Sequence, residues 1–146
     1  MNFFKNKLTG KKYSKLLKFG FSNKFILENS GLLAGNKAFY RQMKIFEIIK
    51  KTHKVKGDII EFGIWNGNNL ITIKKILDYL RINKKVFGYD NFKGFPNPSK
   101  LKNQKKGKYI GNPNTIKKII SFFKLKNIKI FNDDIMSLIK YKKKFK

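Results

Sequence analysis

Three short apolar runs alternate with longer amphipathic stretches along the central and C-terminal parts of the chain. The runs cover residues 59–62 (IIEF), 84–90 (KKVFGYD) and 127–131 (NIKIF). The first of them is too short for a helix and too apolar for an edge strand. Strands that alternate with amphipathic helices are typical of a parallel sheet with right-handed crossovers. We therefore predict an α/β fold in which helices flank a parallel sheet.

The stretches between these runs have the spacing of helices. Residues 33–53 and 70–80 place apolar side chains at i, i+3 and i+4. A further helix is predicted to run to about residue 123, with Asn114 or Thr115 as its N-cap. The helix that starts near residue 70 has Asn68 and Asn69 available as caps.

Acidic residues gather where the predicted strands end. The chain has eight acids, and Glu61, Asp90, Asp133 and Asp134 lie at or just after the ends of the three runs. In a parallel α/β sheet, ligands bind beyond the carboxyl ends of the strands. Half of the acids would therefore lie on the rim where a ligand is expected.

This acidic rim suits a ligand that carries a cation, a ribose and an exocyclic amine. Glu61 could attract an ammonium group, Asp90 could accept both hydroxyls of a ribose, and Asp134 could accept from an adenine amine. Gly63 and Gly67 would let the backbone approach the ligand closely, and the helix that follows offers its N-terminus to a carboxylate. S-adenosylmethionine presents all of these groups together.

Other interpretations of the rim are weaker. The loop is G-x-x-x-G rather than the G-x-G-x-x-G of dinucleotide sites. A strand-end acid can also be a helix cap or a solvated turn residue, and for Asp133 this is the better interpretation. For Glu61 it is the poorer one, because Asn68 and Asn69 lie nearer the helix.

Two motifs resemble one enzyme family. EFGIWNG, followed by FGYDNFKGFP, is similar to the loop and second-strand segment of the macrocin O-methyltransferase family, whose members are class I S-adenosylmethionine-dependent enzymes. KGKYIGNPNTIKKII and FNDDIMSLI continue the similarity, which covers roughly residue 30 to the end. The resemblance implies a Rossmann-like fold of which this chain holds the first three strands, and an acceptor hydroxyl on a sugar or other small molecule. It assigns cofactor binding to Glu61, Gly63, Gly67 and Asp90. Our set of candidate cofactor-binding residues also includes Trp65, Asn68, Asn91, Phe92 and Asp134.

Aromatic residues and the single histidine leave alternatives open. Trp65 could flank the cofactor or pack the loop onto the next helix. Phe92 and Phe95 could cover the ligand, although packing of a turn is favoured for them. His53 lies before the first strand, at the end opposite the expected site, so a surface role is favoured over that of a general base.

The chain departs from the family at its C-terminus. The family's Asp-x-Asp-x-Tyr segment on the fourth strand, which supplies metal ligands and the catalytic acid or base, has no counterpart here. We therefore expect a C-terminally truncated domain with unknown catalytic residues, and magnesium is expected only by resemblance, without ligands in this chain. The alternative is a non-catalytic remnant that binds a nucleotide or a partner. An unpaired sheet edge would favour an oligomer or a completing partner chain.

The formal charge of +27 suggests nucleic-acid binding, but the composition argues against a specific nucleic-acid site. Lysine supplies almost all of this charge, and Arg41 and Arg81 are the only arginines. Base readout favours arginine forks, whereas lysine with isoleucine, asparagine and phenylalanine follows from AT-rich codons. The absence of cysteine fits a cytoplasmic location, and no apolar stretch approaches the roughly 20 residues of a membrane span.

We divide the chain into a basic N-terminal extension, residues 1–30, and a partial methyltransferase domain, residues 31–146. The extension could lie on an anionic membrane as a basic amphipathic helix. A frayed or loosely docked extension is favoured over this alternative.

Overall fold

The computed structural model of the protein describes residues 10–29, 36–95 and 108–134. Contacts divide the chain into two compact units, Met1–Ile48 and Ile49–Lys146. The first unit contains helices α1 (Gly10–Lys18) and α2 (Asn23–Glu28). Helix α4 (Asn36–Thr52) begins in the first unit and ends in the second. The predicted domain boundary after residue 30 stays a prediction.

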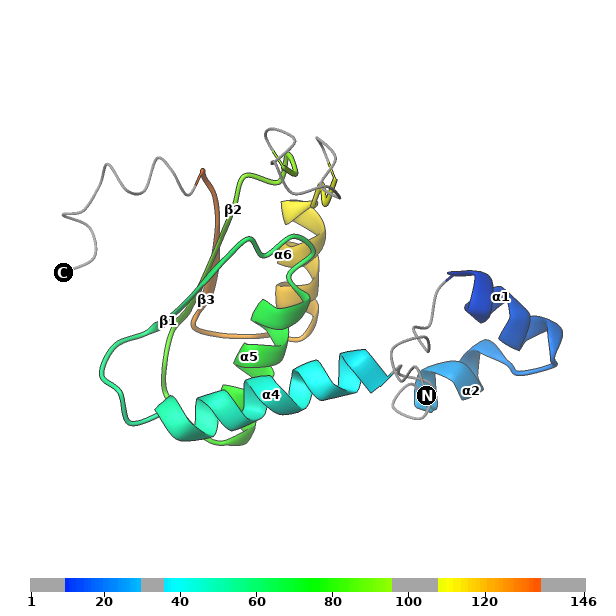
Figure 1. The fold of residues 1–146 in the computed structure, drawn as a ribbon, viewed down its shortest axis with the longest axis horizontal. Helices are drawn as coiled ribbons and strands as arrows, with labels where there is room; N and C mark the ends of the chain where they lie inside the picture. Colours follow the sequence, from blue (N-terminus) through cyan, green and yellow to red (C-terminus); the bar gives the residue numbers. More distant parts are fainter. Residues whose placement is uncertain (1–9, 30–35, 96–107, 135–146) are drawn as a thin grey trace. The chain divides into compact units, whose positions relative to one another are not determined.

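In the described part of the second unit the strands form a parallel sheet with the order β1-β2-β3 (Figure 1). These strands are β1 (Ile59–Phe62), β2 (Val86–Asp90) and β3 (Ile128–Asn132). The register aligns Ile59 with Val86 and Val86 with Ile128. The predicted α/β fold with a parallel sheet is confirmed, and each strand lies within two residues of its predicted run.

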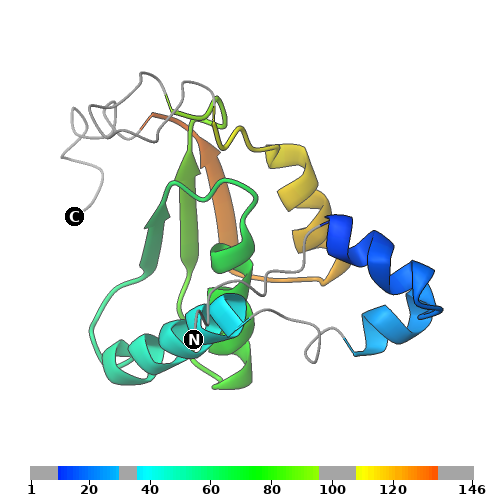
Figure 2. The same cartoon turned by 45° about the vertical axis from the view of Figure 1, so that its right-hand side comes forward.

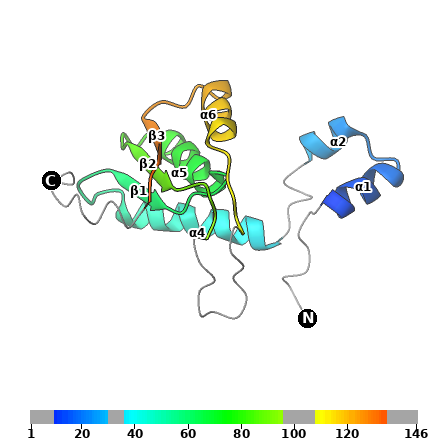
Figure 3. The same cartoon turned by 90° about the horizontal axis from the view of Figure 1, so that it is seen from above.

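Helices α5 (Asn68–Tyr79) and α6 (Pro113–Phe122) connect the strands. Both lie on the same side of the sheet (Figures 2 and 3). This side follows from right-handed crossovers between strands that advance in one direction across the sheet. The core between helices and sheet includes four fully buried side chains: Leu70, Leu77, Val86 and Ile116.

The predicted caps of both helices were wrong. Helix α6 begins at Pro113, and the side chain of Asn112 accepts from the backbone N–H groups of Asn114 and Thr115, at 3.0 and 3.3 Å. Proline favours the first helical position because it lacks the N–H that would stay unpaired there, so the cap is the residue before it.

Helix α5 has Gly67 at its N-cap position, with a φ of 73° and no capping side chain. Asn69 instead hydrogen-bonds Glu61, and the carbonyl of Asn68 accepts from the hydroxyl of Thr72 at 2.8 Å. Neither asparagine caps the helix, because the chain enters α5 through a left-handed glycine.

Candidate cofactor site

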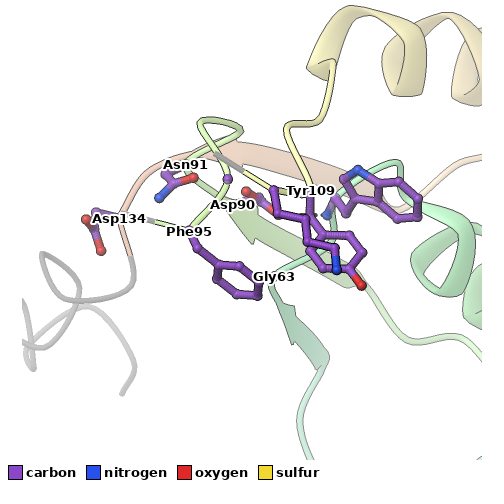
Figure 4. A pocket seen from close by; sticks show the side chains of 9 residues that line it. Gly63, Asp90, Asn91, Phe95, Tyr109 and Asp134 are labelled. Atoms are coloured by element: carbon purple, nitrogen blue, oxygen red, sulfur yellow. Dashed lines mark hydrogen bonds between the residues drawn. The ribbon is translucent and has the colours of Figure 1, made fainter. Parts of the chain in front are cut away.

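A cavity of about 300 Å³ lies at the carboxyl ends of the strands (Figure 4). The loop after β1, the end of β2 with its turn, and the segment before α6 contribute to its wall. The end of β3 contributes a further acid. Nine residues line this cavity: Gly63, Trp65, Asp90, Asn91, Gly94, Phe95, Lys108, Tyr109 and Asp134.

The carboxylate of Asp90 joins two loops of the site. Its Oδ2 accepts from the backbone N–H of Trp65 at 2.7 Å, and its Oδ1 accepts from the backbone N–H of Phe92 at 2.7 Å. Trp65 and Phe92 have φ values of 48° and 54°, which are uncommon for non-glycine residues. Backbone strain of this kind persists only where the surroundings fix it, and here the same carboxylate holds both residues.

Asp90 keeps acceptor capacity after these two bonds. An ionised carboxylate has about four lone-pair sites, and the two amides occupy one on each oxygen. Because Asp90 also lines the cavity, one acceptor site on each oxygen is left for hydroxyls of a ligand. The loops are thus held in place by the group that would bind the ligand.

The two glycines of the loop after β1 differ in their surroundings. Gly63 has a φ of 74°, donates its N–H to the carbonyl of Tyr89 at 2.8 Å, and has open space where a Cβ would lie. A Cβ on Gly67 would lie 3.0 Å from Cγ2 of Ile116. Gly63 therefore leaves room for a ligand, whereas Gly67 allows close packing against α6.

Glu61 lies on the helix-covered side of β1, in register with Gly88. Burial raises the pKa of its carboxyl above the usual 4.5, and a hydrogen bond with Asn69 opposes that shift. Its Oε2 is buried and has no hydrogen-bond partner among the described residues. An unpaired buried acceptor is rare in a folded protein and fits a donor that a ligand would supply.

An aromatic wall closes one side of the cavity. The ring of Tyr109 meets Trp65 and Phe95 edge to face, at centroid distances of 5.4 and 5.6 Å. The indole Nε1 of Trp65 donates to the carbonyl of Ile110 at 3.0 Å. Trp65 therefore lines the cavity, where it could flank a ligand, and it also packs against the segment before α6.

The structure brings together five of the nine predicted cofactor residues at the cavity. Gly67 packs against Ile116, and the side chain of Phe92 is buried beside Gly111. Five of the nine line the cavity, namely Gly63, Trp65, Asp90, Asn91 and Asp134, and four do not, namely Glu61, Gly67, Asn68 and Phe92.

Sequence reasoning missed Gly94, Lys108 and Tyr109, and it favoured turn packing for Phe95, which lines the cavity. Phe95 and Gly94 belong to the turn-rich segment after β2, a signal that could have found them. Lys108 and Tyr109 follow a lysine-rich stretch with no periodic pattern, and the only cue for them is that KGKYIGNPNTIKKII continues the family resemblance.

The remaining acids and the histidine occupy other positions. The backbone N–H of Asp133 donates to the carbonyl of Asp90 at 3.1 Å, and its Oδ1 accepts from the N–H of Asp134 at 2.8 Å. His53 follows the end of α4, and its Nδ1 lies 2.7 Å from the carbonyl of Lys50. Among residues 10–29, 36–95 and 108–134, no group of three metal-ligating side chains comes together. In the same part of the chain, no helix is both long and apolar enough to cross a membrane.

Comparisons with known proteins agree with this architecture. The family model for macrocin O-methyltransferase (TylF) matches residues 33–126. The crystal structure of CalS11, a calicheamicin methyltransferase, aligns with a TM-score of 0.72 and 18% sequence identity. That alignment covers 90% of this chain and 59% of the other, so the chain spans little more than half of the solved structure. A comparison with curated proteins gives no match.

Proposed function

Because the chain belongs to the macrocin O-methyltransferase family, we propose that it binds S-adenosylmethionine in the cavity at the carboxyl ends of β1 and β2. The activity we propose is transfer of a methyl group to a hydroxyl of a sugar or another small molecule. Asp90 is the observation that supports this proposal most, because its carboxylate lines the cavity and retains free acceptor sites on both oxygens.

The residues present fit the parts of this cofactor. Asp90 would accept the two ribose hydroxyls, and the open space at Gly63 would admit the ligand against the backbone. Glu61 does not line the cavity, so its unpaired Oε2 would accept from the ammonium group of the cofactor through a bridging water. Asp134 and the ring of Phe95 line the wall where the adenine would lie.

The bound cofactor would supply an electrophilic methyl group on its sulfonium. The described residues contribute orientation, since methyl transfer depends on holding donor and acceptor in line. They also restrict water on one side through the rings of Trp65, Phe95 and Tyr109. No residue is assigned as the base that takes the hydroxyl proton, and magnesium carries no step of the proposal.

Two further proposals concern the surroundings of the domain. We place it in the cytoplasm, in line with a sequence that has no cysteine. We also propose that another strand or chain covers the edge of the sheet at β1, where Ile60 and Phe62 are 40% and 50% exposed.

Isothermal titration calorimetry with S-adenosylmethionine and with S-adenosylhomocysteine tests the assignment of Asp90. We expect Asp90→Asn to weaken both affinities by about tenfold or more, because a charge-assisted hydrogen bond contributes roughly 1.5 to 3 kcal/mol. Asp133→Asn is the matched control, since it removes the same charge from a strand-end residue that does not itself line the cavity.

Circular dichroism on both variants would establish that they fold before affinities are compared. Equal affinity in wild type and Asp90→Asn would refute the assignment of Asp90. Absence of binding by the folded wild-type chain would refute the proposed site altogether.

A further inference from the structure

The first unit contains a small helical hairpin built from α1 and α2. The hydroxyl of Tyr13 donates to Oδ1 of Asn23 at 2.6 Å and joins the two helices. Between them the chain turns at Gly20, which has a φ of 87°, and the N–H of Phe21 donates to the carbonyl of Leu16 at 3.2 Å. The side chain of Ser22 caps α2 by accepting from the N–H of Phe25 at 3.1 Å. These bonds define the turn, so its side chains have a fixed arrangement.

The hairpin exposes large apolar side chains around its turn. Phe19 is 81% exposed. The rings of Phe21 and Phe25 stack with their centroids 5.1 Å apart, and both side chains remain exposed. Leu27 on α2 is 76% exposed. Ile26 is buried and forms the small interior. Soluble proteins seldom expose a group of aromatic side chains of this kind unless it contacts a partner or a membrane.

The net charge of the hairpin is strongly positive. Residues 10–29 contain five lysines and one acid, a net charge of +4. The acid, Glu28, lies 3.9 Å from Lys24, and both side chains are well exposed. Lys15 and Lys18 in the last turn of α1 lie next to the apolar turn in sequence. Aromatic side chains flanked by lysines are the usual composition of segments that bind at the membrane interface.

The charge also selects among possible partners. The hairpin of a second copy carries the same excess of lysine, so contact between two hairpins would bring like charges together. A nucleic acid would satisfy the lysines but would leave the exposed rings of Phe19 and its neighbours in water unless bases stacked on them. An anionic bilayer offers negative headgroups and an apolar layer directly beneath them.

We infer that the α1–α2 hairpin docks on the surface of an anionic lipid bilayer, with the rings of Phe19, Phe21 and Phe25 entering the interface and the lysines contacting headgroups. The interaction is peripheral and reversible, and salt weakens it because it depends on exposed charges. It is a property of the first unit and does not depend on the proposed cofactor site.

Vesicle co-sedimentation of the full chain tests this inference. We expect the protein to sediment with vesicles of phosphatidylcholine and phosphatidylglycerol and to stay in solution with phosphatidylcholine alone. Phe19→Ser should reduce partitioning onto the anionic vesicles by about tenfold, because one buried aromatic ring is lost from the interface. Phe122→Ser is the matched control, since Phe122 on α6 is 79% exposed and lies outside the hairpin.

A charge-reversal pair separates the hairpin from the general charge of the chain. Lys15→Glu with Lys18→Glu should abolish most of the vesicle binding, while Lys117→Glu with Lys118→Glu on α6 should retain most of it. Equal losses in the two double variants, or equal losses in Phe19→Ser and Phe122→Ser, would overturn the inference. Binding to single-stranded RNA with no binding to anionic vesicles would also overturn it.

Calorimetry on Phe19→Ser keeps this test apart from the proposed function. An unchanged affinity for S-adenosylmethionine would show that the variant folds and that its vesicle result concerns the hairpin alone. Should the wild-type chain bind no cofactor, circular dichroism provides the same evidence of folding.

Discussion

The two faces of the sheet in the second unit have different surroundings, although both carry apolar side chains. On one face α5 contacts β2 and α6 contacts β3, and the side chains of Leu70 and Val86 are fully buried. On the other face the ring of Tyr89 stacks on that of Phe131, with 4.6 Å between the ring centroids, and its centroid lies 5.7 Å from that of Phe62. Phe62 on that face is half exposed.

This difference separates what stabilises the unit from what remains open to a partner. Parallel strands that are apolar on both faces are typical of sheets covered on both sides. Here the covered face supplies the buried core, and the open face presents a row of rings that a partner could bury. We therefore expect substitutions on the covered face to change stability strongly, and those on the open face to change association.

The largest effect is expected for Leu70→Ala. Leu70 is fully buried, and a Cβ on Gly88 would lie 2.7 Å from its Cδ2, so its methyl groups fill the space above β2. Loss of a buried leucine side chain costs roughly 2 to 5 kcal/mol in the free energy of unfolding, measured by urea denaturation. Ile60→Ala on the open face is the control, and we expect it to cost less than about 1 kcal/mol.

A cost for Ile60→Ala as large as that for Leu70→Ala would break the comparison. It would mean that the open face is buried in solution, by another copy or by another part of the chain. Equal, small costs for both variants would instead mean that α5 does not form the core with β2.

The type and order of the strands and helices that form the covered face could be predicted from the sequence, because their signals lie within short stretches of the chain. The runs that became β1, β2 and β3 are short, apolar and separated by amphipathic stretches, so their type and order follow from periodicity. Alternation along β1 also places Ile59 and Glu61 on one face, which the sequence interpretation did not use.

The site depended on contacts between distant residues, which the sequence could not show. Asp90 accepts from Trp65, 25 positions away, and Tyr109 meets rings that lie before the lysine-rich stretch. Strand-end position was enough to select Asp90 and Asp134. It could not show that Glu61 does not line the cavity, or that Gly67 packs against Ile116.

A moderate effect is expected on association. We expect the wild-type chain to associate reversibly through the open face and through the edge of β1 that pairs with no strand among the described residues. Sedimentation velocity over a range of concentrations would show this association as a rising average mass. Ile60→Ser with Phe62→Ser should weaken the association about tenfold or more, because two exposed apolar side chains are removed. Phe122→Ser with Phe123→Ser on α6 is the control. Equal weakening in both double variants would assign the association to another surface.

The smallest effect concerns Glu61, which belongs to the covered face. Because burial raises the pKa of this carboxyl, the folded state holds its proton more tightly than the unfolded state does. The contribution of Glu61 to folding stability is therefore most favourable below the ordinary pKa of 4.5. It becomes less favourable as the pH rises from 4.5 through the raised pKa of the folded state, and above that pKa it no longer changes. Glutamine has a similar shape and stays neutral.

Glu61→Gln should therefore gain stability relative to wild type as the pH rises through that window, by a small fraction of the Leu70→Ala effect. Urea denaturation of both proteins at several pH values from 4 to 8 measures the difference. The size of the gain reports how poorly the protein alone solvates Oε2, and saturating S-adenosylmethionine should reduce it if the ligand supplies a donor to that oxygen. A difference that is flat with pH, or one in which wild type gains as the pH rises, would show that Glu61 is well solvated and that the covered face contains no unmet acceptor.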